Sequence, residues 1–271
     1  MLTDAHCHPF NLAEHFPAAE DERRRLGVIC AASATTIEEF EYCERLSHQA
    51  DSDAAAPLLP CFAVHPQMPA YEKSKGLENR CRDGLDVLET LAAQGRLAAV
   101  GETGFDLFNA AYRETEKIQD DLFAAHLETA LRHDLPLVIH ARRAMHKIFA
   151  HDTALKKCRA VVFHSWSGTQ GEGEALLRRG INAFFSFGTG IMLNHRAAMH
   201  CCAVFPADRL LTETDAPFQP LRGREFSVYA DLRSILETMA ALRRETGNGG
   251  STVLEIEKIV ENNFRAAFCY M

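Results

Sequence analysis

Residues 2–8 read Leu-Thr-Asp-Ala-His-Cys-His, a short start that ends in two closely spaced histidines. On an extended strand the side chains at positions i and i+2 point to the same face, so His6 and His8 would stand side by side. Such a pair can share one divalent ion, but a metal site usually needs three or four protein ligands. Alone, the pair is more typical of a solvated N-terminus, and its meaning depends on ligands elsewhere.

Seven further short apolar runs follow the first one. Most are continuously apolar, as expected for parallel strands covered on both faces. The eight predicted strands are 2–5, 27–32, 58–64, 97–101, 135–140, 160–164, 181–187 and 210–214. The predicted helices between and after them are 35–49, 80–94, 115–133, 141–157, 169–179, 191–202, 230–244 and 252–268. This alternation predicts the α/β class and a closed (β/α)8 TIM barrel.

The composition indicates one large globular domain. The chain has 271 residues, of which 47% are apolar, and no linker rich in proline, glycine or serine divides it, so we expect a single hydrolase domain over residues 1–271. We find no apolar run long enough to cross a membrane and no signal region before His6, and therefore expect a cytoplasmic protein. The nine cysteines include no C-x-x-C pair and predict neither a disulfide framework nor a zinc ribbon.

Side chains of the metal-binding type stand at the ends of five predicted strands. Because the carboxyl ends of barrel strands surround one mouth, these residues would converge there. In chain order the candidate ligands are His6, His8, Glu102, His140, His164 and Asp215. Each has a structural alternative, such as a hydrogen-bonded histidine, a helix cap or, for the aspartate, a turn. Five such strand ends together favour a metal site.

The candidates divide naturally into two sets. The two histidines of the first strand and Asp215 can hold one ion, the two later histidines a second, and the oxygens of Glu102 can bridge them. Two ions roughly 3.5–4 Å apart polarise a phosphoryl oxygen and generate hydroxide at neutral pH. We expect Asp215 and Glu102 to be catalytic, with Asp215 as the base that orients the water. Magnesium, manganese and zinc are the candidate ions; nitrogen ligands favour the last two over magnesium.

Two residues near the mouth are expected to bind substrate. Arg142, two positions after His140, can grip a phosphate or carboxylate, although a surface salt bridge is an equal alternative. His65 follows the third strand and can contact substrate or protonate a leaving group, or else fix its loop. The net charge of −8 argues against a broad basic surface that coats DNA, but it leaves room for a local pocket that takes a strand end.

Four more residues lie near the predicted mouth. Arg222 and Arg224 follow the eighth strand and can bind phosphate or form salt bridges. Phe105 and Trp166 stand close to ligands in the sequence, where they can stack on bases or simply form a wall. Asp4, two residues before His6, would lie on the same strand face one layer deeper in the barrel. We therefore expect it to support the ligands or to be a polar core residue, and not to bind the metal itself.

Seven motifs in this order resemble those of the TatD-type metal-dependent deoxyribonucleases, within the amidohydrolase superfamily. They occupy residues 4–8, 64–66, 100–106, 136–142, 163–168, 213–217 and 263–268 and so span nearly the whole chain. The resemblance implies a (β/α)8 barrel, divalent metals on the six candidate ligands, and hydrolysis of DNA phosphodiester bonds, often from a strand end. Departures from the family pattern fall at Ala63, at residues 107–109 and at residues 222–227, in loops that are expected to contact substrate.

We therefore expect a metal-dependent hydrolase that uses two divalent ions and acts as a deoxyribonuclease, exonuclease-like, on single-stranded DNA or strand ends. One alternative is a hydrolase of small-molecule esters or amides that uses the same metals. A closed apolar pocket would favour it, whereas an open basic groove would favour a nuclease. A second alternative is a non-catalytic protein that only binds nucleic acid.

Overall fold

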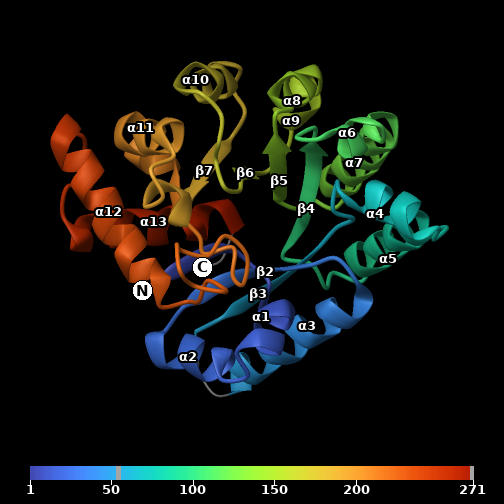
Figure 1. Ribbon diagram of the computed structural model, residues 1–271, viewed down its shortest axis with the longest axis horizontal. Coiled ribbons are helices and arrows are strands. Elements are labelled where there is room, and N and C mark those ends of the chain that lie inside the picture. The colour runs from blue at the N-terminus through green and yellow to red at the C-terminus, as the bar shows by residue number, and fades with distance from the viewer. Residues whose placement is uncertain (53–55, 269–271) are drawn as a thin grey trace.

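The computed structural model describes residues 1–52 and 56–268, so Cys269 lies outside the described residues. Eight parallel strands form one sheet in sequence order, and the sheet curls into a TIM barrel with helices around it (Figure 1). The strands are β1 (Thr3–Cys7), β2 (Ile29–Ala34), β3 (Leu58–Phe62), β4 (Ala99–Asp106), β5 (Leu137–Arg142), β6 (Val161–Phe163), β7 (Ala183–Phe187) and β8 (Leu210–Thr212). All eight overlap the strands predicted from the sequence.

Helices cover the outside of this sheet. They are α1 (Pro9–His15), α2 (Ala19–Leu26), α3 (Ile37–Ser52), α4 (Met68–Lys75), α5 (Arg80–Ala93), α6 (Ala110–Arg113), α7 (Glu116–Arg132), α8 (Met145–Ala150), α9 (Asp152–Leu155), α10 (Gln170–Arg178), α11 (Arg196–Val204), α12 (Asp231–Thr246) and α13 (Val253–Phe268). Two short 3-10 helices are η1 (Thr189–Ile191) and η2 (Ala207–Arg209). None of the described helices has the length and apolar composition needed to cross a bilayer.

The helix predictions hold for six segments and need correction in two. The predicted helix 141–157 starts late, because β5 continues its pairing with β4 to Arg142, and it is divided at His151 into α8 and α9. The predicted helix 191–202 is η1 followed by α11. Helix α1 was not predicted, although Pro9 in its first turn, directly after His8, is a helix-start signal.

Strands β1 and β8 meet through individual hydrogen bonds rather than a regular ladder. The Thr212 hydroxyl donates to the Thr3 carbonyl oxygen at 2.7 Å, the Asp215 amide donates to the His6 carbonyl oxygen at 2.9 Å, and the His8 amide donates to the Ala216 carbonyl oxygen at 2.8 Å. The pairing of β1 with β2 also shifts in register between Asp4 and Cys7. These bonds hold His6 of β1 and His8, which directly follows β1, beside Asp215, which follows β8.

The strands alternate between two apolar clusters. In β5, for example, Val138 belongs to an inner cluster, whereas its neighbours Leu137 and Ile139 belong to the larger cluster that includes helix residues. Helix α13 adds Phe264 and Phe268 to the inner cluster. The strand residues of that inner cluster are Ala5, Ile29, Ala31, Cys61, Ala99, Val138, Val162, Phe184 and Leu211. They fill the amino-terminal half of the barrel and leave the carboxyl-terminal half to polar side chains.

Candidate metal centre

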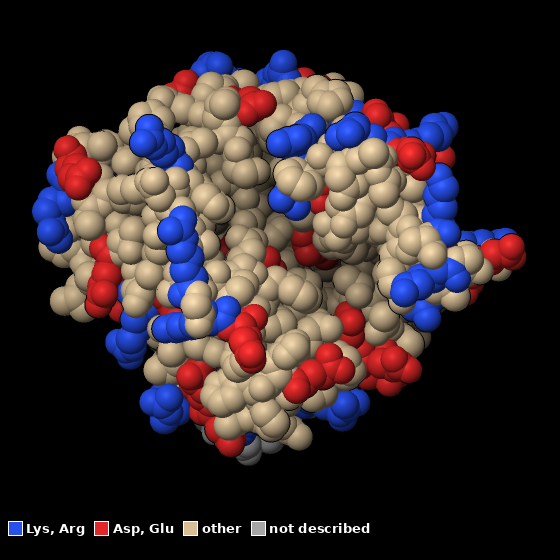
Figure 2. All heavy atoms as spheres, viewed as in Figure 1, with Lys and Arg blue, Asp and Glu red and all other residues tan. Residues whose placement is uncertain are grey.

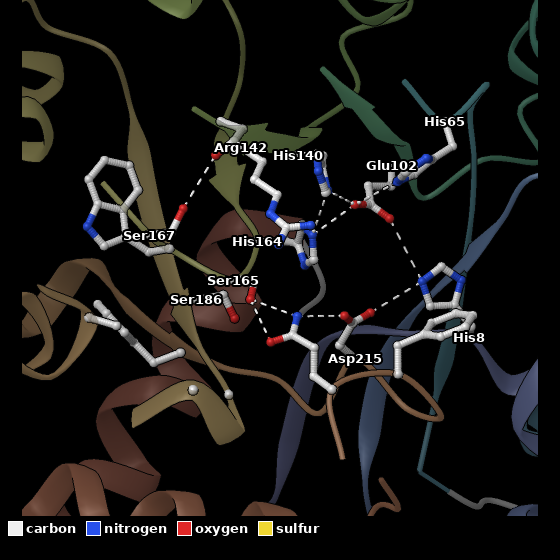
Figure 3. A pocket seen from close by; sticks show the side chains of 18 of the residues that line it. His8, His65, Glu102, His140, Arg142, His164, Ser165, Ser167, Ser186 and Asp215 are labelled. Atoms are coloured by element: carbon white, nitrogen blue, oxygen red, sulfur yellow. Dashed lines mark hydrogen bonds and ion pairs between the residues drawn. The ribbon is translucent and has the colours of Figure 1, made fainter. Parts of the chain in front are cut away.

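Glu102 lies at the mouth of the barrel, and its two carboxylate oxygens face different histidines (Figure 3). Oε1 is 2.7 Å from His140 Nδ1 and 2.8 Å from His164 Nε2. Oε2 is 3.2 Å from His6 Nε2 and 3.8 Å from His8 Nε2. The side chain is 4% exposed, so few contacts with water compete with these. A carboxylate in this position can bridge two cations.

Asp215 completes the side of the mouth formed by β1 and β8. Its Oδ1 is 3.6 Å from His6 Nε2 and 3.4 Å from His8 Nε2. In the part of the chain that the structure describes, three groups of donor atoms are close enough together to hold a metal ion: His6, His8 and Glu102; His6, His164 and Asp215; and His65, Glu102 and His140. The structure thus brings all six predicted ligands together. It differs from the predicted division by placing His164 with Asp215 and by adding His65.

The chemistry of these donors fits divalent cations. Ring nitrogens point at one another, with 3.1 Å between His6 Nε2 and His8 Nε2 and 3.3 Å between His140 Nδ1 and His164 Nε2. A neutral imidazole has one N–H and one lone pair, so four rings that converge on two carboxylates offer several lone pairs to the same small space. Nitrogen and carboxylate ligands in this ratio suit zinc or manganese better than magnesium.

Electrostatics keep both carboxylates ionised. Burial alone would raise the pKa of Glu102, but the charges of His164, His65 and His6 hold it well below its usual value. Burial opposes ionisation of Asp215 as well, yet the hydrogen bond from His8 lowers the pKa of its carboxyl group. Both side chains therefore carry negative charge at neutral pH and attract cations to the mouth.

The histidine pKa values are shifted in both directions. For His164, burial lowers the pKa, but Glu102 and Glu213 together raise it well above the usual value. Burial also opposes protonation of His8, and Asp215 nevertheless raises its pKa. In His6 burial dominates and, with the nearby His164, lowers the pKa. Because cations and protons compete for these nitrogens, metal binding will weaken as the pH falls.

Asp106, which sequence reasoning did not single out, holds His140 from its far side. Asp106 Oδ2 is 3.2 Å from His140 Nε2 and accepts a hydrogen bond of 2.7 Å from Gln67 Nε2. The close approach of β4 to β5 depends on Gly104, which has φ +132° and where a Cβ would lie 2.1 Å from the His140 carbonyl oxygen. Gly104, Phe105 and Asp106 belong to one of the motifs noted in the sequence. Asp106 was not considered for the site because the fourth strand was predicted to end at residue 101, whereas β4 continues to Asp106.

Two more of the candidate ligand histidines have an oxygen near the ring nitrogen Nδ1. Ser33 Oγ is 3.1 Å from His6 Nδ1, and such a hydrogen-bond partner orients a ligating imidazole and selects the nitrogen that binds metal. Glu213 Oε1 is 3.6 Å from His164 Nδ1, which is close enough for an ion pair but too far for a hydrogen bond. Glu213 could have been found from its position two residues before Asp215; nothing in the sequence marks Ser33.

The expectation for Asp4 is confirmed. It is fully buried, and its carboxylate accepts hydrogen bonds from the Thr214 hydroxyl at 2.6 Å and from the Thr214 amide at 2.9 Å. Burial raises its pKa to about 8. Asp4 therefore ties β1 to the segment that carries Asp215, and it does not belong to the groups of donor atoms described above.

A pocket of about 890 Å³ opens above the donor atoms and is visible as a hollow in the surface (Figure 2). Both predicted substrate-binding residues, His65 and Arg142, line it (Figure 3). His65 Nδ1 accepts the Gln67 amide at 3.2 Å, so the ring proton sits on Nε2, 3.3 Å from Glu102 Oε1. The guanidinium carbon of Arg142 lies 3.7 Å from the centre of the Phe108 ring. Within the described residues Arg142 has no carboxylate partner.

For four further residues the structure decides between the alternatives that the sequence left open. Arg224 forms an ion pair with Asp231, and neither it nor Arg222 lines the pocket. Phe105 is buried against Phe123 and has no face available for a base. Trp166 does line the pocket, but its ring is buried and packs edge-on against Phe185. Both aromatic residues are close to a candidate ligand in the sequence, which predicts their place near the mouth but not the direction of their side chains.

Known proteins resemble this chain over nearly its full length. The family model described as "TatD related DNase" matches residues 3–269. The chain is 34% identical over 239 residues to a metal-dependent hydrolase, BU355, of Buchnera aphidicola subsp. Acyrthosiphon pisum, a match that covers 83% of this chain and 85% of the relative. It superposes on the crystal structure of the TatD homologue YjjV from Escherichia coli K12 with a TM-score of 0.81 and 26% identity, covering 100% of this chain and 98% of YjjV.

Two of the similar proteins, both from Cronobacter species, are named as nucleases. The chain is 35% identical over 135 residues to the 3'-5' ssDNA/RNA exonuclease TatD of Cronobacter sakazakii, a match that covers 48% of this chain and 49% of that relative.

Proposed function

Because the chain belongs to the TatD-related DNase family and is a metal-dependent hydrolase, we propose that it is a deoxyribonuclease that hydrolyses phosphodiester bonds at single-stranded DNA ends. We assign the whole chain, residues 1–271, to one hydrolase domain. The exonuclease named among its relatives supports the choice of a nucleic-acid substrate.

We propose that the cofactor is a pair of divalent ions, manganese or zinc rather than magnesium. The observation that carries this proposal is the position of Glu102, whose two oxygens face two different sets of histidines. The six ligands would be His6, His8, Glu102, His140, His164 and Asp215. Such a pair of ions, when bound, polarises a phosphoryl oxygen and supplies a water nucleophile at neutral pH.

The protein's own side chains would handle the protons. Asp215 is ionised and lies at the edge of the donor cluster, so it is placed to take a proton from the attacking water. His65 carries its ring proton on Nε2, which points into the mouth and can donate to the leaving oxygen. The guanidinium of Arg142 lies over the Phe108 ring and can bind the DNA phosphate next to the one that is cleaved.

Features of the pocket rim support a single-stranded polynucleotide over a small molecule. Tyr71 and Phe218 line the pocket and yet are 46% and 49% exposed, respectively, so each has a face on which an unpaired base can stack. Arg196 adds positive charge to the same pocket. Figure 2 shows an open hollow with basic side chains above it and acidic ones below, a local asymmetry that favours a phosphate backbone along one edge.

A substrate panel tests the proposal. The protein is stripped of metal with a chelator, reloaded with manganese, zinc or magnesium, and assayed on single-stranded and double-stranded oligodeoxynucleotides, oligoribonucleotides, a simple phosphodiester, and small esters and amides. We expect metal-dependent shortening of single-stranded DNA that weakens as salt rises. Turnover of an ester or amide with indifference to DNA would contradict the proposal. DNA binding without turnover in any metal would indicate a binding protein.

A further inference from the structure

We infer that Gln219 is a positioning residue that fixes the carboxylate of Asp215 and so decides which of its oxygens faces the metal site. The inference rests on the proposed function, because it takes Asp215 to be a ligand and base. Gln219 lies four residues after Asp215, in the loop that follows β8, and it lines the same pocket.

The Gln219 side chain joins Asp215 to the loop after β6. Its Nε2 donates to Asp215 Oδ2 at 2.7 Å and to Ser165 Oγ at 2.8 Å. The Ser165 hydroxyl lies 3.1 Å from Gln219 Oε1. Figure 3 shows Ser165 on the side of Asp215 that faces away from His8.

The orientation of this amide follows from its partners. Asp215 Oδ2 lies 2.7 Å from the amide of Gln219, and a carboxylate oxygen accepts hydrogen bonds, so the amide atom that faces it is the nitrogen. The Ser165 hydroxyl can donate or accept and is satisfied by either amide atom. Only one orientation of Gln219 therefore fits, and the amide cannot turn without placing two acceptors in contact.

The backbone of this network is held in an unusual conformation. Ser165, Asp215 and Gln219 have φ values of +46°, +55° and +54°, and they are three of the seven described non-glycine residues with positive φ. Each such residue costs on the order of 1 kcal/mol or more and persists only where its surroundings enforce it. For Gln219 the enforcing contact is the Thr189 hydroxyl, which donates to the Gln219 carbonyl oxygen at 2.6 Å.

As a consequence, the two carboxylate oxygens of Asp215 have different, fixed partners. Oδ2 is engaged by Gln219, whereas Oδ1 faces His6 Nε2 and His8 Nε2 at 3.6 and 3.4 Å. Without the amide, the carboxylate could rotate about its Cβ–Cγ bond and present either oxygen, or both, to a cation. Partners that orient a ligand typically contribute 10- to 100-fold, roughly, to metal affinity or activity.

The test measures Co²⁺ binding to metal-free protein by calorimetry and visible absorption, followed by kcat and KM on a single-stranded oligonucleotide. Gln219→Leu removes the donor and keeps a similar volume. We expect roughly tenfold weaker Co²⁺ binding, a changed absorption band, and a kcat that falls about 10- to 100-fold with little change in KM. The matched control is Gln170→Leu, which removes a surface glutamine that bonds Glu174 at 2.6 Å and is expected to change nothing.

A double-mutant cycle separates positioning from general structural damage. Ser165 is expected to act on Asp215 only through Gln219, so Ser165→Ala combined with Gln219→Leu should bind Co²⁺ no more weakly than Gln219→Leu alone. Additive losses, or unchanged Co²⁺ affinity and spectrum in Gln219→Leu, would overturn the inference. Asp215→Asn is the reference: if it leaves Co²⁺ binding intact, the proposed ligand set itself is wrong, whereas its loss beside an unaffected Gln219→Leu refutes only the positioning role.

Discussion

The amino-terminal half of the barrel interior (the lower half) and the carboxyl-terminal half (the upper half) differ sharply, although they are only two residues apart along the chain. The lower half is apolar and is closed by Phe264 and Phe268 of α13. Its members on five strands are Ala31, Val138, Val162, Phe184 and Leu211. The residues two positions further along those strands are Ser33, His140, His164, Ser186 and Glu213.

This contrast separates the source of stability from the source of function. The lower half removes apolar surface from water, which is the dominant favourable term in folding. The upper half gathers buried polar atoms at a cost: among the described residues, His164 Nδ1, Ser186 Oγ and both oxygens of Glu213 are buried without a hydrogen-bond partner. Substitutions in the upper half should therefore remove activity while preserving the fold, and those in the lower half should do the reverse.

The largest expected effect comes from Glu102→Ala, in the upper half. It removes the carboxylate that faces both sets of histidines, and we expect kcat on single-stranded DNA to fall roughly 10⁴-fold, about 5.5 kcal/mol of transition-state stabilisation. The protein should stay folded, although its melting temperature should fall, because His140 and His164 lose their buried carboxylate partner. Kinetics and thermal unfolding on the same preparation check both parts, and a collapse of the fold would break the comparison.

The opposite substitution is Phe264→Ala, in the lower half. Phe264 is fully buried and lies 4.7 Å, ring centre to ring centre, from Phe268. We expect a loss of about 4 kcal/mol in the free energy of unfolding, with unchanged kcat per folded molecule. Denaturant unfolding measures the loss, and Leu254→Ala, at a position of α13 that is 81% exposed, is the control. Reduced kcat in the folded fraction would show that the two halves are coupled.

A third test uses a buried histidine outside the mouth. His126 accepts the Val64 amide at 2.9 Å, and burial lowers its pKa from 6.5 to about 4. Folded protein thus keeps it neutral, whereas the unfolded chain binds a proton below pH 6.5, so this residue's contribution to stability is present above 6.5 and declines as the pH falls towards 4. Between pH 8 and pH 5 the wild type should lose about 2 kcal/mol more than His126→Gln. Equal slopes in urea unfolding would contradict this.

The smallest expected effect is at the rim. Arg142→Met removes a guanidinium with no carboxylate partner in the described residues and keeps an unbranched chain against Phe108. We expect KM for single-stranded DNA to rise about tenfold, about 1.4 kcal/mol, with a shallower salt dependence. Arg143→Met is the matched control, since Arg143 also lies over Phe108, at 4.7 Å, but does not line the pocket. Equal effects of the two variants would assign Arg142 a non-specific role.

The sequence predicted those parts of the site that follow from strand order. His140 and His164 end continuous apolar runs, so their place at the mouth follows from the barrel alone. The contact between Gln219 and Ser165 joins residues 54 positions apart, and no periodicity marks it. Asp106 was missed because β4 continues past its predicted end. Whether Phe105 stacks on a base or forms a wall could not be decided, because the direction of its side chain depends on that same register.

The most direct test of the proposed dinuclear centre is a manganese titration of metal-free protein followed by electron paramagnetic resonance, with DNA cleavage measured on the same samples. We predict that two equivalents of Mn²⁺ bind per chain, that the second produces the spectrum of a coupled pair, and that cleavage of single-stranded DNA appears with it. Glu102→Ala should lose the coupled spectrum. Full activity with a single equivalent, or two ions that stay uncoupled in the wild type, would contradict the bridging role of Glu102.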